Sequence, residues 1–512
     1  MEDIHWADYT ATRVIKDKGN KKEYVCASGI TPSGHVHIGN FREIITTDLV
    51  VKALERKGKK VKFIYSWDDF DRFRKVPENV PKEFNKYLGM PLIKVPDPFK
   101  CHKSYAEHYE TELEDSIKKL GFDINYIKQG EMHLKCKYAQ GIKIALQEKK
   151  EIITILNKYR REPLESSWWP VTIYCEKCWK DTTKVLNYDK KYQIGYECDC
   201  GFSNEFDFRK KGNIKLRWRP DWSYRWLYEK VDFEPGGKDH STPGGSYDTC
   251  SKIIKKLWNR NAPTYQIYEW IYIKGGGAFS SSTGNVILPK EVLEIYEAPI
   301  IRYLFSGTKP NKEFYISFDL DVVKIYEDFD HLERVYFNKE KVKSEKEKKK
   351  LKRIYELSMV KTPSKMPEQP SFRHMTVLTQ LYEGDIGKAS KGFKSTRVKT
   401  RAINAWNWIQ KYAPEDMKFK VHDKISDEIK KTLTKEQKNA LKILVKKLEK
   451  KKYTENSLFN EFYSIIKETD INNKLFFKGA YLALIGKEKG PKLANFILTL
   501  GQKRVLNLLR QI

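Results

Sequence analysis

The stretch EYVCASGITPSGHVHIGN (23–40), followed by VKFIYSW (61–67), decides the fold. Its first six residues predict a short buried strand, and a turn punctuated by glycines follows them. From His37 to about Arg56 apolar residues recur at helical spacing, which predicts an amphipathic helix. Residues 61–67 predict a second strand. A strand, a helix and a parallel strand form a right-handed βαβ unit, so we expect a doubly wound parallel α/β sheet.

Length and charge narrow the class of protein further. The chain has 512 residues, which predicts about three domains, and its 40% of hydrophobic residues exclude a disordered or fibrous protein. Lys and Arg number 97 against 68 Asp and Glu, and this formal charge of +29 favours a polyanionic partner such as nucleic acid. A lysine-rich surface without such a partner is the ordinary alternative.

The first ten residues lack the apolar core of a secretory signal, and no apolar run reaches the ~18 residues of a membrane span. We therefore expect a cytoplasmic protein without membrane contact.

Changes of residue pattern divide the chain into four segments. Residues 1–164 predict the first half of a Rossmann-like catalytic domain, and residues 211–319 predict its second half. Residues 165–210 interrupt this domain with a cysteine-bearing insertion. From 320 to 512 the strand patterns fade and glycine and proline become sparse, so we expect an all-α domain. Its charged runs, such as KVKSEKEKKKLKR (341–353), are typical of solvated helix faces, and contact with a nucleic acid or another anion is the alternative.

The turn between the first strand and the helix is suited to bind phosphate. A helix N-terminus carries unpaired backbone N–H groups and a partial positive charge, which attract anions. His35 and His37 lie there and can donate hydrogen bonds to oxygens that gain charge during phosphoryl or nucleotidyl transfer. Gly34 and Gly39 leave room for a ligand near the backbone. The alternative is a pair of surface histidines in a tight turn, which the preceding strand and the following helix disfavour.

The same turn resembles a known signature. HVHIGN (35–40) resembles the HIGH motif of class I aminoacyl-tRNA synthetases, with Asn40 in place of the last histidine. PSGHVHIGN is most similar to the glutamyl, glutaminyl and lysyl branch of that class. Small nucleotidyltransferases carry a similar motif, but their chains are far shorter and lack a basic helical tail. The resemblance implies catalytic roles for His35, His37 and Asn40, and ATP contacts for Pro32, Gly34, His37 and Gly39.

A second resemblance lies in AFSSSTGNVI (278–287), which is similar to the KMSKS loop of the same enzymes in its SSxGN form. The lysines usual in this loop are absent. We therefore expect Mg²⁺ bound with ATP, or Lys274, to offset the charge of the leaving pyrophosphate. An ordinary Ser/Gly loop is the alternative for the segment taken alone. The resemblance implies catalytic roles for Ser280, Ser281 and Ser282 and an ATP contact for Thr283.

GGKDH (236–240), between the two signatures, resembles the segment that holds the adenosine ribose in these enzymes. The resemblance assigns that role to Gly237 and Asp239. A carboxylate can accept hydrogen bonds from both ribose hydroxyls, as it does in dinucleotide-binding folds.

Three further fragments match class I lysyl-tRNA synthetases better than glutamyl enzymes: WDDFDRFRKVPENV (67–80), KLRWRPDWSYRW (215–226) and GKDHSTPGGSYD (237–248). Aromatic faces and acceptors hold an ε-ammonium well, with about 0.5–2 kcal/mol from each cation–π contact. A glutamate pocket would need a bidentate arginine instead. The candidate aromatic faces are Trp218, Trp222 and Tyr268, and the candidate acceptors are Asp68 and Asp69. Aromatic core is the alternative role for Trp218 and Tyr268. The resemblance implies that lysine is held by Gly29, Thr31, Trp218, His240 and Tyr268.

Four cysteines are spaced as a metal site. Cys175, Cys178, Cys198 and Cys200 form a CxxC and a CxC knuckle, which suit a tetrahedral structural Zn²⁺ with no open position for chemistry. We expect this zinc in an inserted subdomain that contacts the tRNA acceptor end. Cysteines outside the cluster are expected to be isolated buried thiols, and Cys101–His102 is left as a structural pair because no further ligand is apparent near it. These remaining cysteines are Cys26, Cys101, Cys136 and Cys250.

The C-terminal region resembles the helical anticodon-binding cage of class I lysyl and glutamyl enzymes, in 397–419 and 475–509. Trp406 and Trp408 lie near cationic residues and could stack on flipped bases, although helix core is the favoured role.

The resemblance as a whole implies a lysine–tRNA ligase of class I with tRNA(Lys), ATP and L-lysine as partners, Mg²⁺ and Zn²⁺ as cofactors, and a monomer. The family further implies that tRNA binds before lysine is activated. A glutamyl-type synthetase and a catalytically inactive tRNA-binding paralogue are the alternatives.

Overall fold

A five-stranded parallel sheet organises the N-terminal part of the computed structural model, which describes residues 2–275 and 287–512. The strand order is β10-β9-β1-β2-β3, and every neighbouring pair is parallel. From β1 the chain adds β2 and β3 on one side and later adds β9 and β10 on the other side. The strand order therefore reverses between β1 and β9, where open α/β sheets bind ligands. The strands are β1 Glu23–Ile30, β2 Lys60–Trp67, β3 Asn125–Lys128, β9 Phe233–Gly237 and β10 Thr264–Tyr268.

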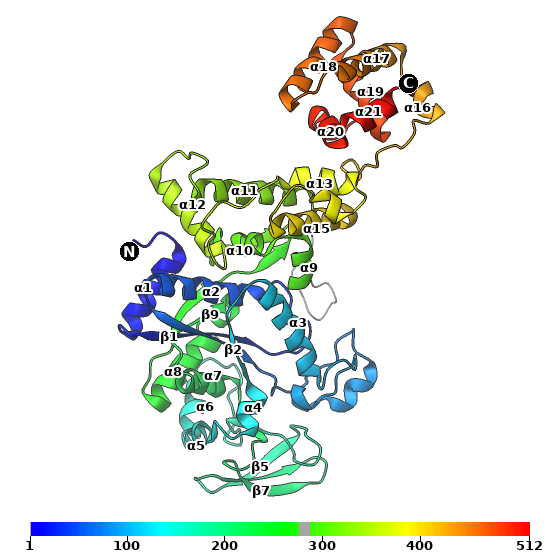
Figure 1. Cartoon of the computed structure of the whole chain (residues 1–512). Coiled ribbons are helices and arrows are strands. Elements are labelled where there is room, and N and C mark those ends of the chain that lie inside the picture. Colours follow the sequence, from blue (N-terminus) through cyan, green and yellow to red (C-terminus); the bar gives the residue numbers. More distant parts are fainter. Residues whose placement is uncertain (1, 276–286) are drawn as a thin grey trace. The chain divides into compact units, whose positions relative to one another are not determined.

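The predicted βαβ unit is confirmed. β1 pairs with β2 along its whole length, from Glu23 opposite Lys60 to Ile30 opposite Trp67. The connecting helix α2 spans Phe41–Arg56 and begins four residues later than His37, because residues 37–40 form a turn. α2 covers one face of the sheet (Figure 1). On the other face, α7 (Trp218–Tyr228) and α8 (Ser246–Trp258) pack on β1 and β2 in one apolar cluster.

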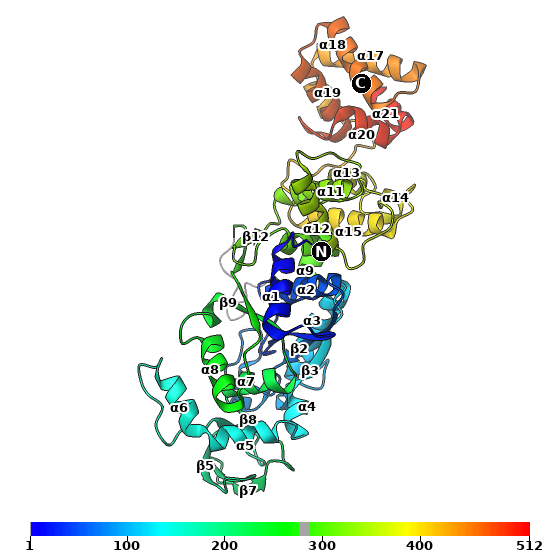
Figure 2. The ribbon, with the colours of Figure 1, turned by 90° about the vertical axis from the view of Figure 1, so that its left-hand side faces the viewer.

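Antiparallel strands carry the cysteine-bearing insertion. β4 (Val171–Ile173) pairs with β8 (Ile214–Leu216), so the chain leaves and re-enters the α/β domain at the same place. Between them β5, β6 and β7 form a three-stranded sheet that lies beyond α5 (Figures 1 and 2). The elements of this region are α5 Ala139–Gln147, α6 Lys149–Asn157, β5 Thr183–Tyr188, β6 Gln193–Cys198 and β7 Ser203–Asp207.

The described residues pack into two compact units that interleave along the chain. The first unit holds residues up to 292 together with 298–316 and 341–362, and the second holds 293–297, 317–340 and 363–512. Helix α12 (Glu345–Ser358) therefore belongs to the first unit, although it follows α11 (Asp321–Tyr336) of the second. Its Arg353 is buried and donates to the carboxylate of Asp8 at 2.7 Å. The charged run 341–353 thus includes a buried ion pair as well as a solvated face.

The first unit contains further elements around the sheet. They are α1 Trp6–Lys18, η1 Lys82–Tyr87, η2 Leu92–Lys94, α3 Tyr105–Lys119, α4 Gln129–Leu134, η3 Lys238–His240, β11 Ile271–Ile273, α10 Ala298–Ser306 and β12 Phe314–Ile316. Helix α9 (Pro289–Ile295) passes from the first unit into the second.

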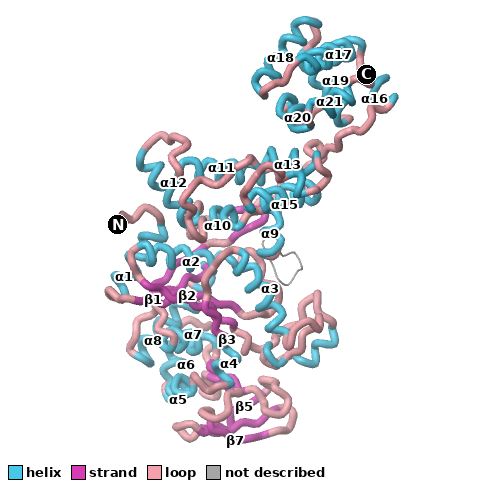
Figure 3. The backbone as a smooth tube through the Cα atoms, viewed as in Figure 1, coloured by secondary structure: helices cyan, strands magenta, loops and turns pink. Residues whose placement is uncertain are grey.

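Every regular element among the described residues of the second unit is a helix, as predicted (Figure 3). Trp408 is fully buried, and its Nε1 donates to the carbonyl of Phe318 at 2.9 Å, which confirms its expected core role. Arg401 beside it is held by Glu297 and Asp330. The helices are α11 Asp321–Tyr336, α13 Phe372–Leu381, α14 Ile386–Ala389, α15 Thr396–Lys411, α16 Asp427–Thr432, α17 Lys435–Lys450, α18 Glu455–Thr469, α19 Asn473–Ile485, α20 Leu493–Leu500 and α21 Gln502–Leu509.

The described helices include none with the length and apolar character needed to span a membrane.

Candidate active site

A cavity of about 650 Å³ opens at the carboxyl ends of the parallel strands. Gly29 and Ile30 line it from the end of β1, Gly237 from the end of β9 and Tyr268 from the end of β10. This is the side of a doubly wound sheet, next to the reversal of strand order, where ligands are expected. Eight of the predicted site residues line the cavity: Gly29, Thr31, Asn40, Trp218, Gly237, Asp239, His240 and Tyr268.

The turn predicted to bind phosphate lies between two of these residues, Thr31 and Asn40. The predicted residues Pro32, Gly34, His35, His37 and Gly39 are on this turn but outside the described lining of the cavity. Gly34 is open, since a Cβ atom there would meet no described atom within 4 Å. A ligand can therefore approach the backbone at this point of the turn.

His37 is held in one orientation by the start of α2. Its Nδ1 accepts hydrogen bonds from the backbone N–H of Gly39 at 3.1 Å and of Asn40 at 3.3 Å. Burial lowers the pKa of His37 to about 4, so the ring is neutral near pH 7. A neutral imidazole that accepts at Nδ1 carries its proton on Nε2. His37 therefore has the donor that a developing phosphate charge requires.

His35 has protein partners at both ring nitrogens. Its Nδ1 lies 2.6 Å from a carboxylate oxygen of Glu112, and its Nε2 lies 3.3 Å from Nδ2 of Asn79. Burial alone would raise the pKa of Glu112, but hydrogen bonds from His35 and Lys290 hold it at about 2. In this arrangement His35 ties the turn to helix α3, and its catalytic role stays a prediction.

Residue 287, the last of the second signature (278–287), contacts the first signature (35–40). Ser280, Ser281, Ser282 and Thr283 lie outside the described residues. Ile287, which closes the quoted segment, accepts a hydrogen bond at its carbonyl from the N–H of Ile38 at 2.9 Å. Ile38 is the second residue of HIGN, so the fold brings the two predicted signatures together.

Glu43, in the first turn of α2, is a site residue that sequence reasoning missed. Its carboxylate accepts hydrogen bonds from Ser28 Oγ at 2.9 Å, from the N–H of Gly29 at 3.2 Å and from Tyr268 Oη at 2.8 Å. Burial raises its pKa. Glu43 thus joins β1, α2 and β10 at the cavity wall. An acid in the first turn of a helix was the available signal, but such acids are common.

A second missed group holds Thr31. The Oγ1 of Thr31 donates to Asp71 at 2.9 Å, and Asp71 is also paired with Lys215. Burial alone would raise the pKa of Asp71, but the Lys215 ammonium keeps it below its usual range. Asp71 and Lys215 line the cavity, so a largely buried ion pair fixes a predicted amino-acid contact.

The two acids proposed from sequence as ammonium acceptors differ in position. Asp68 lines the cavity, and its Oδ1 accepts from Arg225 at 2.5 Å. Asp69 is outside the described lining and instead accepts from the N–H of Gly130 at 2.6 Å. Burial raises the pKa of Asp69 to about 8. The suggestion of Asp69 as an ammonium acceptor is therefore wrong. Of these two successive residues after β2, Asp68 lies at the cavity and Asp69 lies at the start of α4.

An aromatic wall faces the cavity from α7. Trp218 is 39% exposed and stacks on Trp222 with ring centroids 5.0 Å apart, so it is not a core residue. Its Nε1 donates to Ser246 Oγ at 3.3 Å. Behind it, Trp222 and Trp226 donate to the carboxylate of Glu234 at 3.1 and 2.5 Å. Burial raises the pKa of Glu234 to about 7.

The predicted ribose contact has the space that it needs. A Cβ atom at Gly237 would lie 2.5 Å from Oδ1 of Asp239, so glycine lets this carboxylate approach the strand end. The Asp239 side chain is 55% exposed, and His240 beside it is 39% exposed. Both side chains are accessible from the cavity that they line.

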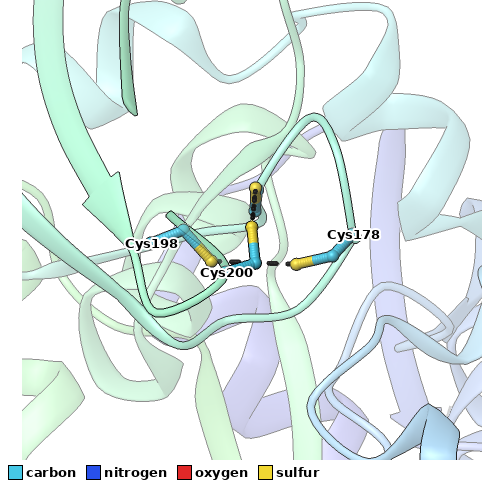
Figure 4. Close-up of side chains that lie close together, drawn as sticks. Cys178, Cys198 and Cys200 are labelled. Carbon is cyan, nitrogen blue, oxygen red and sulfur yellow. Dashed lines mark hydrogen bonds between the residues drawn. The ribbon is translucent and has the colours of Figure 1, made fainter. Parts of the chain in front are cut away.

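The four predicted zinc ligands come together in the insertion (Figure 4). Their sulfur atoms lie within 4.8 Å of one another, with 3.7 Å between Cys175 and Cys200 and between Cys178 and Cys198. A tetrahedral zinc with Zn–S bonds of about 2.3 Å requires about 3.8 Å between sulfurs. The residues therefore fit Zn²⁺.

Two expectations for the other cysteines are wrong. Cys101 is exposed and Cys136 is half-buried, whereas Cys26 and Cys250 are buried as expected. Cys101 and His102 also have further possible ligands near them, namely Asp97 and His108. The sequence gives little sign of this, because the loop that brings Asp97 back to Cys101 has no regular pattern.

These features define an α/β enzyme that binds a nucleotide at the carboxyl ends of its strands. The family model described as "tRNA synthetases class I (K)" matches residues 4–361, and the chain belongs to this family. A model described as "Anticodon binding domain" matches residues 409–512. The predicted class I fold with a helical C-terminal region is thereby confirmed.

Relatives match the chain over nearly its whole length. It is 48% identical to "Lysine--tRNA ligase" of Borreliella burgdorferi, over 98% of both chains. It is 41% identical to the protein of that name in Pyrococcus furiosus, over 99% of both, and 42% identical to that of Treponema pallidum, over 99% of this chain and 98% of the other. A solved glutamate tRNA ligase from Elizabethkingia meningosepticum is 12% identical, with a TM-score of 0.45 over 96% of this chain and 99% of its own.

Proposed function

We propose that the protein is a lysine–tRNA ligase, which activates lysine with ATP and transfers it to the 3′-terminal adenosine of tRNA(Lys). The observation that carries the proposal is the cavity itself, which has an accessible aromatic face and carboxylates and is flanked by the two ends of the turn, Thr31 and Asn40. The full-length similarity to lysine–tRNA ligases supports it. Because this reaction serves protein synthesis, we place the protein in the cytoplasm. Its oligomeric state is proposed to be a monomer.

In the first step the lysine carboxylate attacks the α-phosphate of ATP, and pyrophosphate leaves. No protein nucleophile is required, so catalysis depends on positioning and electrostatics. The neutral ring of His37 donates from Nε2 to a phosphate oxygen that gains charge. Asp239 accepts from the ribose hydroxyls at the end of β9. Mg²⁺ supplied with ATP offsets phosphate charge when it is bound.

Lysine is oriented at both ends. Gly29 and Thr31 meet the α-amino end, with Thr31 fixed by Asp71. Trp218 offers its face to the ε-ammonium, and such a contact contributes about 0.5–2 kcal/mol. His240 and Tyr268 complete the wall.

In the second step the terminal ribose hydroxyl of tRNA attacks the adenylate. The cysteine-bearing insertion, with Zn²⁺ on Cys175, Cys178, Cys198 and Cys200, contacts the acceptor end. The region matched by the anticodon-binding model, 409–512, binds the anticodon. Activation requires bound tRNA.

ATP–pyrophosphate exchange, measured with each of the twenty amino acids and with or without tRNA, tests the proposal. We expect exchange with lysine in the presence of tRNA(Lys). Exchange with glutamate in place of lysine would assign the protein to the glutamyl type. An absence of exchange with every amino acid, with tRNA still bound, would identify an inactive tRNA-binding paralogue. Equally fast exchange without tRNA would contradict the tRNA requirement alone.

A further inference from the structure

We propose that helix α9 couples helix α15 to the histidine turn (residues 31–40), and that Asn404 and Asn407 of α15 act through α9 as positioning residues for lysine activation. Helix α9 begins two residues after the second signature and passes from the first unit into the second. The part of the proposal that concerns lysine activation rests on the proposed function, whereas the coupling of α15 to the turn does not.

The start of α9 is tied to the histidine turn in two ways. The carbonyl of Ile287, just before the helix, accepts from the N–H of Ile38 at 2.9 Å. Lys290 Nζ donates to Glu112 at 2.6 Å, and the same carboxylate lies 2.6 Å from Nδ1 of His35. The turn is therefore held at its backbone by Ile287 and at its His35 side chain, through Glu112, by Lys290.

The last carbonyl groups of α9 are held by α15. A helix leaves its last four carbonyls without partners inside the helix. Asn404 Nδ2 donates to the carbonyl of Leu293 at 2.8 Å, and Asn407 Nδ2 donates to that of Glu294 at 3.0 Å. Lys411 of α15 pairs with the Glu294 side chain. Positions 404, 407 and 411 share one face of a helix, so a single face of α15 caps the end of α9.

Buried charges hold the chain directly after α9 to the same helix. The Glu297 carboxylate accepts from Arg397 Nε at 2.6 Å and from Arg401 Nε. Arg401 also donates to both oxygens of Asp330 in α11, each at 2.9 Å. Glu297, Arg401 and Asp330 are buried, and separating a buried pair leaves an uncompensated charge. Residues 293–297 therefore follow α15 when it moves.

Packing does not explain the amide at position 404. Asn404 is buried, and its Oδ1 has no hydrogen-bond partner in the described part of the chain. Leaving such an oxygen unsatisfied lowers stability, whereas a leucine of similar shape avoids this loss. The feature that requires an amide at this position is the hydrogen bond to α9.

Helix α15 also leads into the region proposed to bind the anticodon. The match to the anticodon-binding model begins at residue 409, within α15. Helix α9 has seven residues, so its two ends move together. A shift of α15 on RNA binding would therefore move Ile287 and Lys290, and with them the turn that carries His35 and His37.

Amide hydrogen exchange of the full-length protein without ligands tests the coupling. Asn404→Leu with Asn407→Ala removes both donors to α9, and we expect exchange about tenfold faster in peptides that cover 31–42, because the N–H of Ile38 loses a firmly held acceptor. Gln410→Ala, at an exposed position of the same helix, is the control and should leave this exchange unchanged. Faster exchange confined to α9 and α15 would overturn the coupling.

The half-buried position of Asn407 provides a milder variant. Far-UV circular dichroism identifies a double variant that fails to fold, and Asn407→Ala alone then replaces it in the same measurement. We expect faster exchange in 31–42 here as well, and exchange equal to that of Gln410→Ala would overturn the coupling.

Lysine-dependent ATP–pyrophosphate exchange at saturating tRNA(Lys) tests the positioning role. We expect Asn407→Ala to lower kcat about tenfold, because a small misplacement of catalytic groups is costly, while the KM for lysine and the Kd for tRNA change less than twofold. Asn407→Gln, which keeps the donor, should recover part of the rate. Equal kcat values for Asn407→Ala and Gln410→Ala would overturn the positioning role.

A double-mutant cycle tests whether the two ends of α9 act together. If Lys290→Met and Asn407→Ala both act through α9, the loss in kcat of the double variant should be smaller than the product of the single losses. Losses that multiply would show independent effects and overturn the proposal. If the wild type activates no amino acid, the proposed function fails, while hydrogen exchange still decides the coupling.

Discussion

His37 serves two purposes at once. Its Nδ1 accepts hydrogen bonds from the backbone N–H groups of Gly39 and Asn40, just before α2, and this contact fixes the proton on Nε2. The low pKa keeps the ring neutral, so the donor does not depend on pH in the neutral range. The turn therefore gains stability and a phosphate donor from one side chain.

Replacing His37 by alanine should affect both rate and stability. We expect adenylate formation to slow by about 10²–10³, since one transition-state donor is lost. We also expect the free energy of unfolding to fall by about 1 kcal/mol, because two backbone N–H groups lose their acceptor. His37→Asn, which keeps a side-chain acceptor and a donor, should recover part of each loss. Single-turnover kinetics and urea unfolding check these results, and unchanged turnover would remove His37 from the catalytic residues.

Glu234 gives the protein a specific dependence of stability on pH. Burial raises its pKa to about 7 in the folded state, from 4.5 in the unfolded chain. Between these values the folded protein holds a proton that the unfolded chain has released, so the free energy of unfolding falls as pH rises. The full change is about 3 kcal/mol. The urea midpoint of the wild type should therefore fall relative to that of Glu234→Gln as the pH rises from about 4.5 to about 7.5. If the midpoints of the two proteins change with pH in parallel, the raised pKa of Glu234 is contradicted.

At the scale of elements, the spacing of apolar residues predicted the helices and strands that neighbouring residues determine. It did not predict features that depend on contacts between distant parts of the chain. β1, α2 and β2 were predictable because apolar spacing over some 45 residues defines each of them. Helix α12 was not assigned to the first unit, because its Arg353 pairs with Asp8, 345 residues away in sequence. Glu43 and Glu234 were missed for the same reason, since their partners come from other elements.

The folding of the cysteine-bearing insertion should depend on the proposed zinc. Replacing Cys175 and Cys178 by serine should release about one zinc per chain, since metal binding and local folding are linked. Amide exchange should then become faster in β5, β6 and β7, while β1 and β2 stay protected. Slow exchange in these three strands after metal loss would show that the sheet is stable by itself.

Lys274 follows β11 and precedes the second signature. Its backbone N–H donates to the carbonyl of Ile316 at 3.0 Å, which fixes where this strand ends. If its ammonium meets the leaving pyrophosphate, Lys274→Ala should slow adenylate formation at least tenfold, about 1.4 kcal/mol of barrier. Lysine introduced at Ser281 or Thr283 should restore part of the rate. Unaffected single-turnover activation at saturating ATP and Mg²⁺ would leave the metal to offset the charge.

At the scale of the whole molecule, we expect the net charge to contribute to tRNA affinity. With a formal charge of +29, the protein should displace many of the counterions that surround a bound nucleic acid. We expect the Kd for tRNA to rise at least tenfold between 50 and 200 mM salt, while the Kd for lysine changes little. Fluorescence titration of tRNA(Lys) at several salt concentrations checks this. A Kd for tRNA that does not depend on salt would show that the lysine excess is unrelated to RNA.

The interleaving of the two units has a consequence for biosynthesis. A fragment that ends at residue 319 would lack α12 and would leave the buried carboxylate of Asp8 without Arg353. On the ribosome, the α/β unit therefore cannot be completed until residue 362 has emerged, by which time part of the helical unit has already been translated. Nascent chains stalled before that point should remain sensitive to protease, although every residue of the parallel sheet is already present.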